Sequence, residues 1–189
     1  MYRPIGSTGK LFGRRWFVAI FISTITLLCG FFSSFSVAES RSEAEVRAAV
    51  IAGLLRFTHW QNPGNGRICI VGDAPSAAVL LQAADKIRLA GEPASVERVK
   101  DFTTTAECQV VVIGPLPANT LASYSKPPEA NQLVICDKCD NSRQFVDIEL
   151  ILRSGRMAFN VHLFDPDTSP IQFGSAMLEL ANSIEVHKH

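Results

Sequence analysis

Three short apolar runs, separated by segments with helical features, constrain the fold of this chain most strongly. They occupy residues 68–71, 109–113 and 133–135 and are rich in valine and isoleucine. Short runs that are apolar at consecutive positions are typical of strands buried on both faces. Residues 95–99 add a weaker candidate strand. Strands that alternate with helices predict a mostly parallel sheet with helices on its faces.

The first predicted helix has a clear start. Ser42 and Glu45 form a capping-box pattern. Apolar residues follow at the spacing of one helix face: Val46, Val50, Leu54 and Phe57. We expect this helix to end near His59 and Trp60, because residues 62–66 form a cluster of turn-forming residues.

Three further helices are predicted from weaker patterns. The second follows a Gly-Asp-Ala-Pro turn with Asp73 as a plausible N-cap, and a short third helix runs from Pro117 toward Tyr124. The second helix carries apolar residues Val79, Leu80 and Ala83. The last helix carries one apolar face, made of Met177, Leu180, Ala181 and Ile184.

A hairpin is predicted before the last helix. Residues 146–152 and 157–163 flank an Arg-Ser-Gly-Arg turn. The second arm alternates between a face with Met157, Phe159, Val161 and Leu163 and a polar face with Ala158, Asn160 and His162. The sequence therefore predicts a single α/β domain, with a core over about residues 42–186. Its sheet is mixed and mostly parallel, with helices on its faces and a C-terminal hairpin plus helix.

The N-terminal segment differs from the rest in charge. The chain has 18 Lys and Arg and 18 Asp and Glu, but residues 1–38 hold four basic residues and no acidic one. A basic start, an uncharged stretch over 16–35 and the small residues before Glu39 predict a signal peptide cleaved near Ala38. A retained membrane anchor is the alternative, because 20 residues can span a bilayer. Residues 39–189 would then be an exported domain of net charge −4, which disfavours nucleic acid as a partner.

Four cysteines remain after removal of the signal: Cys69, Cys108, Cys136 and Cys139. An even number in an exported chain predicts two disulfides, with three possible connectivities. We favour Cys69–Cys108 and Cys136–Cys139, because two neighbouring strands would bring the first pair within bonding distance. The second pair also allows a redox dithiol or half of a metal site, and the acidic neighbours Asp137 and Asp140 disfavour a reactive thiolate.

No arrangement in the sequence favours catalysis. The chain lacks the glycine-rich phosphate-binding loops, the G-x-S-x-G turn and the H-E-x-x-H motif. The histidines His59, His162, His187 and His189 form no paired spacing that would complete a metal site with the cysteines. We therefore expect no enzyme activity, no catalytic residues, no cofactor and no metal.

Several segments, in this order, resemble the YfiR family of small periplasmic proteins. They are the first helix with its terminal aromatic-x-x-Trp at Phe57 and Trp60, the strand and turn at 68–73, the strand at 108–114, the late strand at 155–163 and the final helix at 175–181. The resemblance covers nearly all of residues 39–189. It implies a periplasmic α/β protein that forms homodimers. It also implies that Cys69 and Cys108 are the family's strand-linking pair, whereas Cys136 and Cys139 match less closely.

The function that the resemblance implies is regulatory. Such proteins repress an inner-membrane diguanylate cyclase by binding its periplasmic sensor region, which lowers cyclic di-GMP and biofilm formation. The protein would then touch the membrane only through its partner. A protein that acts through a surface needs apolar anchors, and we expect them at Phe164, Ile171 and Phe173. Those three residues could instead only pack the final helix onto the sheet.

Two other functions stay open. The chain could be a periplasmic binding module for a small molecule or an envelope component, acting on another membrane sensor; a large pocket with convergent polar groups would favour it. It could also be a thiol oxidoreductase that uses Cys136 and Cys139.

Overall fold

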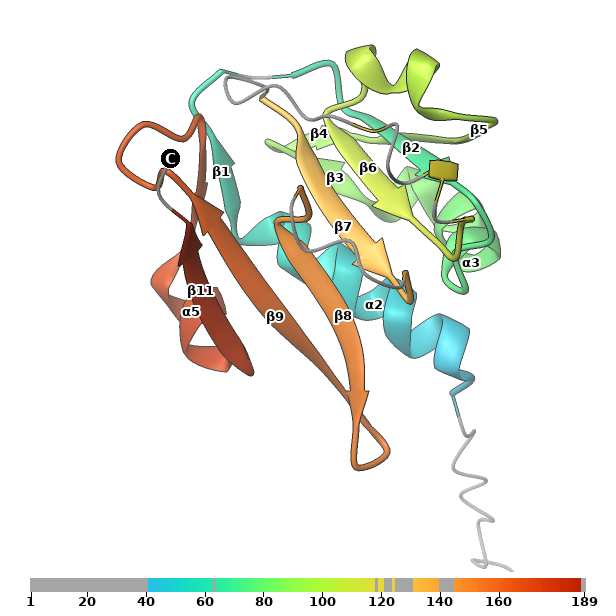
Figure 1. Cartoon of the computed structure of the whole chain (residues 1–189). Helices are drawn as coiled ribbons and strands as arrows, with labels where there is room; N and C mark the ends of the chain where they lie inside the picture. The colour runs from blue at the N-terminus through green and yellow to red at the C-terminus, as the bar shows by residue number, and fades with distance from the viewer. Residues whose placement is uncertain are drawn as a thin grey trace, which may run out of the picture. The chain divides into compact units, whose positions relative to one another are not determined.

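A seven-stranded sheet organises the domain in the computed structural model (Figure 1). The structure describes residues 41–62, 64–117, 119–120, 124, 131–139 and 145–187. The signal peptide, its cleavage near Ala38 and most of the helix expected after Pro117 lie outside the described residues. The strand order is β11-β9-β8-β7-β6-β2-β5. The strands are β2 (Arg67–Val71), β5 (Ser95–Val99), β6 (Val110–Ile113), β7 (Leu133–Asp137), β8 (Ile148–Arg153), β9 (Arg156–Phe164) and β11 (Ser183–His187).

The sheet is mostly parallel, as the sequence predicts. Strands β5, β2, β6, β7 and β8 run parallel to one another. Strands β8 and β9 form the expected antiparallel hairpin. The hairpin turn places Ser154 and Gly155 at positive φ, 50° and 74°. Two consecutive residues of that kind match the right-handed twist of the strands they join. The mixed α/β fold class is confirmed.

Two apolar layers cover the two faces of the sheet. Alternate residues of β2 divide between them: Ile68 and Ile70 face the layer under α2 (Glu43–Arg56) and α3 (Ala77–Gln82), whereas Cys69 and Val71 face the other layer. The second layer is covered by the 3₁₀ segment η3 (Phe102–Glu107) and by aromatic side chains. Strands buried on both faces explain why these runs are apolar at every position.

Helix α2 starts as predicted and ends earlier than predicted. Ser42 is its N-cap, with both hydrogen bonds of the capping box formed with Glu45. The helix ends at Arg56, and Thr58–Trp60 forms strand β1 instead of a last helical turn. Strand β1 pairs antiparallel with β10 (Ile171–Phe173). The expected end near His59 and Trp60 is therefore wrong, because a distant strand takes up the backbone hydrogen bonds of this segment.

Helix α3 begins at Ala77 with Ser76 as N-cap residue, so the N-cap expected at Asp73 is wrong. The short elements η2 (Ala84–Lys86), β3 (Arg88–Leu89) and β4 (Glu92–Pro93) follow before β5. Strands β3 and β4 form a separate two-stranded hairpin.

The C-terminal region departs most from the sequence prediction. Helix α5 spans only Ser175–Leu180, and Ile184 belongs to strand β11, which pairs parallel with β9. The side chain of His162, expected on a polar outer face, is 1% exposed. Strand β11 pairs with the edge of β9 and brings its own side chains against His162. The formation of this strand therefore explains both differences, the shorter last helix and the buried His162. No helix within the described ranges is long and apolar enough to cross a membrane.

Candidate functional site

A pocket of about 250 Å³ lies at the C-terminal end of β9. The residues expected to anchor a partner, Phe164, Ile171 and Phe173, all line it. The other lining residues are Asp147, His162, Leu163, Pro166, Ser169, Gln172 and Leu178. The pocket thus combines an apolar floor with polar side chains.

The three predicted anchors have different environments. Ile171 is 7% exposed and belongs to the main core together with Met177. Phe173 is half-buried and packs against that core. Phe164 is also half-buried, and its ring stacks on the imidazole of His187 with centroids 4.8 Å apart. Ile171 therefore serves packing, whereas Phe164 and Phe173 reach the pocket with part of their surface accessible.

Exposed apolar side chains follow the pocket in the sequence. Leu180, at the end of α5, is 73% exposed, and Ile184 and Val186 on β11 are 44% and 54% exposed. Ile184 and Val186 alternate along the strand and so share one face of it. We call these three residues the apolar C-terminal surface. The sequence pattern predicts Leu180 and Ile184 on one apolar helix face. That prediction is wrong for Ile184, because the helix ends at Leu180 and strand β11 begins at Ser183.

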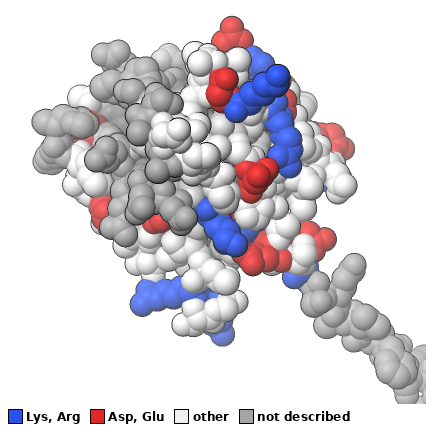
Figure 2. Space-filling model, turned by 45° about the vertical axis from the view of Figure 1, so that its right-hand side comes forward, with Lys and Arg blue, Asp and Glu red and all other residues white. Residues whose placement is uncertain are grey.

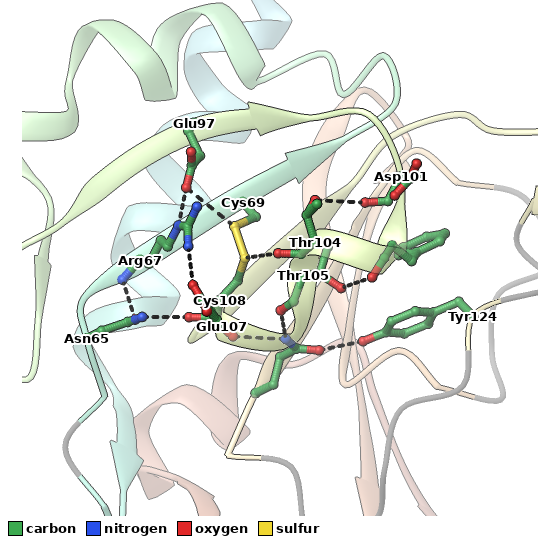
Figure 3. Close-up of a disulfide and its surroundings, with 12 residues drawn as sticks. Asn65, Arg67, Cys69, Glu97, Asp101, Thr104, Thr105, Glu107, Cys108 and Tyr124 are labelled. Carbon is green, nitrogen blue, oxygen red and sulfur yellow. Dashed lines mark hydrogen bonds and ion pairs between the residues drawn. A yellow bond between two sulfur atoms is a disulfide. The ribbon is translucent and has the colours of Figure 1, made fainter.

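The Cys69–Cys108 disulfide links strand β2 to the end of η3 (Figure 3). The two Cα atoms are 5.9 Å apart, which is an ordinary disulfide separation. Beside it, the guanidinium of Arg67 binds Glu97 and, at 2.9 Å, Glu107. The bond to Glu97 is the main cause that raises the pKa of Arg67, and the same bond lowers the pKa of Glu97. The structure thus pairs the cysteines as favoured above, beside a network of ion pairs.

A buried polar network closes the same layer. The hydroxyl of Tyr124 donates to Oε1 of Gln132 at 2.6 Å. The amide of Gln132 donates to the carbonyl oxygens of Thr105 and Cys108, at 2.6 and 2.9 Å. Burial, and then the nearby Asp147 carboxylate, raise the pKa of Tyr124. These groups hold η3 to the sheet, so their arrangement is structural.

The Cys136–Cys139 disulfide links Cys136, inside β7, to a residue just after that strand. Cys136 is fully buried and Cys139 is 6% exposed. A dithiol that exchanges with a substrate needs an accessible, activated thiolate. Burial of Cys136 therefore disfavours the oxidoreductase hypothesis.

The carboxylate of Asp137, between those cysteines in sequence, is fully buried. It accepts a hydrogen bond from Arg47 of α2 at 2.8 Å and another from the backbone N–H of Ser76 at 2.9 Å. Burial lowers the pKa of Arg47, but its bonds to Glu43 and Asp137 raise it more. One carboxylate thus ties the first helix and the start of α3 to the end of a central strand.

A protein-family model described as YfiR/HmsC-like matches residues 44–182. The chain belongs to the YfiR/HmsC-like family. A search of curated proteins found no match. The family resemblance inferred from the sequence is confirmed, and members of this family are generally regulatory, non-catalytic proteins.

For a YfiR/HmsC-like protein, the two disulfides are consistent with export from the cytoplasm. Disulfides form and persist in oxidising compartments. Figure 2 shows basic and acidic side chains interspersed over one face of the molecule. Binding of a polyanion requires clustered basic residues instead, so the charges on this face do not favour such a partner.

Proposed function

We propose that the chain is an exported regulatory protein that represses an inner-membrane diguanylate cyclase by binding its periplasmic sensor region. Repression would lower cyclic di-GMP and biofilm formation. The observation that carries this proposal is the YfiR/HmsC-like match over residues 44–182. The segment 1–38 would direct export with cleavage near Ala38, and the two disulfides support a periplasmic location.

The proposed contacts are of two kinds. One is the pocket rim with Phe164 and Phe173, and the other is the apolar C-terminal surface, whose strand residues lie on the face of β11 opposite to His187. Large exposed apolar side chains are costly on a monomer and mark contact sites when they gather. Aromatic side chains, phenylalanine included, are enriched at the buried centre of protein interfaces. The protein itself would be a homodimer, which light scattering on the purified protein measures directly.

Deletion of the gene tests the cellular role. We expect cyclic di-GMP and surface attachment to rise in the deletion strain and to return to the parental level when the gene is restored. Unchanged cyclic di-GMP under several growth and envelope-stress conditions would contradict repression of a cyclase.

A surface substitution tests the proposed contact. Leu180→Lys places a charge on the most exposed apolar side chain of the apolar C-terminal surface and should abolish co-purification with the sensor region. Leu81→Lys is the matched control, because Leu81 is an exposed leucine of α3, which lies near the opposite edge of the sheet from α5 (Figure 1). Equal binding by both variants, with unchanged melting temperatures, would rule out this surface.

The pocket supports a second candidate, a binding module for a small molecule. Asp147, Ser169 and Gln172 supply polar groups beside the apolar floor, which is the usual composition of ligand sites. Mass spectrometry of the small molecules released from the denatured, freshly purified protein tests it. One compound released in a stoichiometric amount would support it, and the absence of any such compound would count against it.

A further inference from the structure

Three metal-binding side chains meet where β9 and β11 pair. In the parallel register His162 lies opposite Glu185, and Phe164 lies opposite His187. Residues 162 and 164 on β9, like residues 185 and 187 on β11, are two apart and therefore point to the same face. His162, Glu185 and His187 form a cluster whose potential ligand atoms all lie within 4.8 Å of one another.

The distances within this cluster fit a tetrahedral metal ion. Nδ1 of His162 is 3.4 Å from Nε2 of His187 and 3.5 Å from Oε2 of Glu185, and the last two atoms are 3.9 Å apart. Metal–ligand bonds of about 2.0–2.1 Å around tetrahedral zinc place neighbouring ligand atoms roughly 3.3 Å apart. Two of the three separations already have this length, and the exposed carboxylate of Glu185 needs only a small movement to shorten the third.

We propose that His162, Glu185 and His187 bind one divalent transition-metal ion of the Zn²⁺ type, with water in the fourth position. Two imidazole nitrogens and one carboxylate are donors that zinc accepts, whereas Ca²⁺ and Mg²⁺ require oxygen ligands. Three protein ligands with one open position form a known class of zinc site. Sequence spacing does not indicate this site, because His162 and Glu185 are far apart in the chain and meet only through strand pairing.

The surroundings hold two of the ligands in place. His162 is 1% exposed, and its backbone N–H donates to the carbonyl of Asp147 on the neighbouring chain segment at 2.8 Å. The ring of Phe164 stacks on His187 at an interplanar angle of 18°. Ligands whose orientation is fixed by packing lose little freedom when they bind an ion.

A metal ion here would fasten the edge strand β11 to β9. It would lie beside the pocket, since His162 and Phe164 also line that pocket. It would also fix the strand that carries Ile184 and Val186. The metal site requires neither the cyclase partner nor a small ligand, so its test is independent of the proposed function.

The test measures Zn²⁺ binding to the full-length gene product, purified without a polyhistidine tag. Equilibrium dialysis should give one Zn²⁺ per chain, and Zn²⁺ should raise the melting temperature, because it binds the folded state. Co²⁺ in its place should give the intense visible absorption of a tetrahedral site. A wild-type protein that retains no Zn²⁺ would overturn the proposal.

Variants of the two accessible ligands identify the site. His187→Ala and Glu185→Gln should weaken Zn²⁺ binding at least about tenfold each, since loss of a supporting residue alone costs 10–100-fold. The controls are His59→Ala and Glu179→Gln, which change exposed residues on β1 and α5. Zn²⁺ affinity that is unchanged in His187→Ala, or lowered equally in the controls, would overturn the assignment. His162 is left intact because it is buried.

Discussion

The buried ion pair between Arg47 and Asp137 offers the sharpest test of how this fold is held together. The two side chains are 3% and 0% exposed and are joined at 2.8 Å. The change Arg47→Met keeps an unbranched side chain of comparable length and removes the positive charge. Asp137 would keep its bond from the N–H of Ser76, but its charge would stay buried without a counter-ion.

The expected cost is large. Removal of one partner from a buried ion pair typically destabilises a protein by about 3–5 kcal/mol. For a domain of this size, about 1 kcal/mol corresponds to a shift of roughly 2–4 °C, so Arg47→Met should melt about 6–20 °C below the wild type. Total stabilities are about 5–15 kcal/mol, so this substitution removes a substantial share of the stability.

Thermal unfolding followed by circular dichroism measures this loss. Glu43→Gln is the matched control, because Glu43 binds the same guanidinium at 2.8 Å from an exposed position. It should change the melting temperature little. The double variant Arg47→Met/Asp137→Leu should recover stability relative to Arg47→Met, since no buried charge remains unpaired. An Arg47→Met protein that melts at the wild-type temperature would refute this reasoning.

Three further predictions concern other parts of the domain. A disulfide that closes a longer loop restricts the unfolded chain more, so its loss should cost more stability. Cys69→Ser/Cys108→Ser opens a link between residues 39 positions apart and should cost about 4 kcal/mol, whereas Cys136→Ser/Cys139→Ser, with a separation of 3, should cost about 2 kcal/mol. Denaturant unfolding measures both costs, and equal costs would contradict this dependence on loop length. Gly114→Ala should destabilise the protein by about 1–3 kcal/mol, because the added Cβ would lie 2.1 Å from the backbone nitrogen of Ala74. Gly53→Ala in α2 should instead stabilise it by about 0.5–1 kcal/mol, because the added Cβ would have no atom within 4 Å. The same unfolding assay would refute each prediction by a change of the opposite sign. Tyr124 has a raised pKa in the folded state, so the free energy of unfolding that its neutral form contributes is complete below about pH 10 and is lost as pH rises through the folded-state pKa. Tyr124→Phe should therefore remove part of the loss of stability at alkaline pH. A pH profile of stability identical to that of the wild type would contradict this.

Local sequence patterns were sufficient to predict the strands at the centre of the sheet. The strands at Val110–Ile113 and Leu133–Asp137 are buried on both faces. Residues 110–113 and 133–136 are therefore apolar at every position, and this pattern can be read without knowing which strands pair. The capping box at Ser42 and the turn at Ser154 and Gly155 are equally local, since each is formed by residues within a few positions. These features depend on hydrogen bonds and dihedral angles that a short peptide segment already encodes.

The two elements that were predicted wrongly depend on pairing with strands that are distant in the sequence. Residues 58–60 continue the apolar spacing of α2, but pairing with Ile171–Phe173 makes them a strand. Residues 183–187 continue the spacing of α5, but the N–H of Asn182 donates to the carbonyl of Phe159, and the chain then runs along β9. In both places the residues have helical spacing over only a few positions, and hydrogen bonds to a distant strand stabilise the extended conformation more than the helix.

The same distant pairing builds the region to which we assign function. Strand β11 turns Ile184 and Val186 outward on one face and brings Glu185 and His187 against His162 on the other. The pocket beside them depends on the segment that forms β10. In strands β2 and β7, by contrast, two disulfides and a buried ion pair hold the chain to neighbouring segments. An edge strand next to a rigid sheet is where binding can shift structure at low cost. A Zn²⁺ ion that fastens β11 would therefore tighten the proposed partner surface, and Leu180→Lys and His187→Ala separate the two effects, because the first changes the surface and leaves the metal ligands intact.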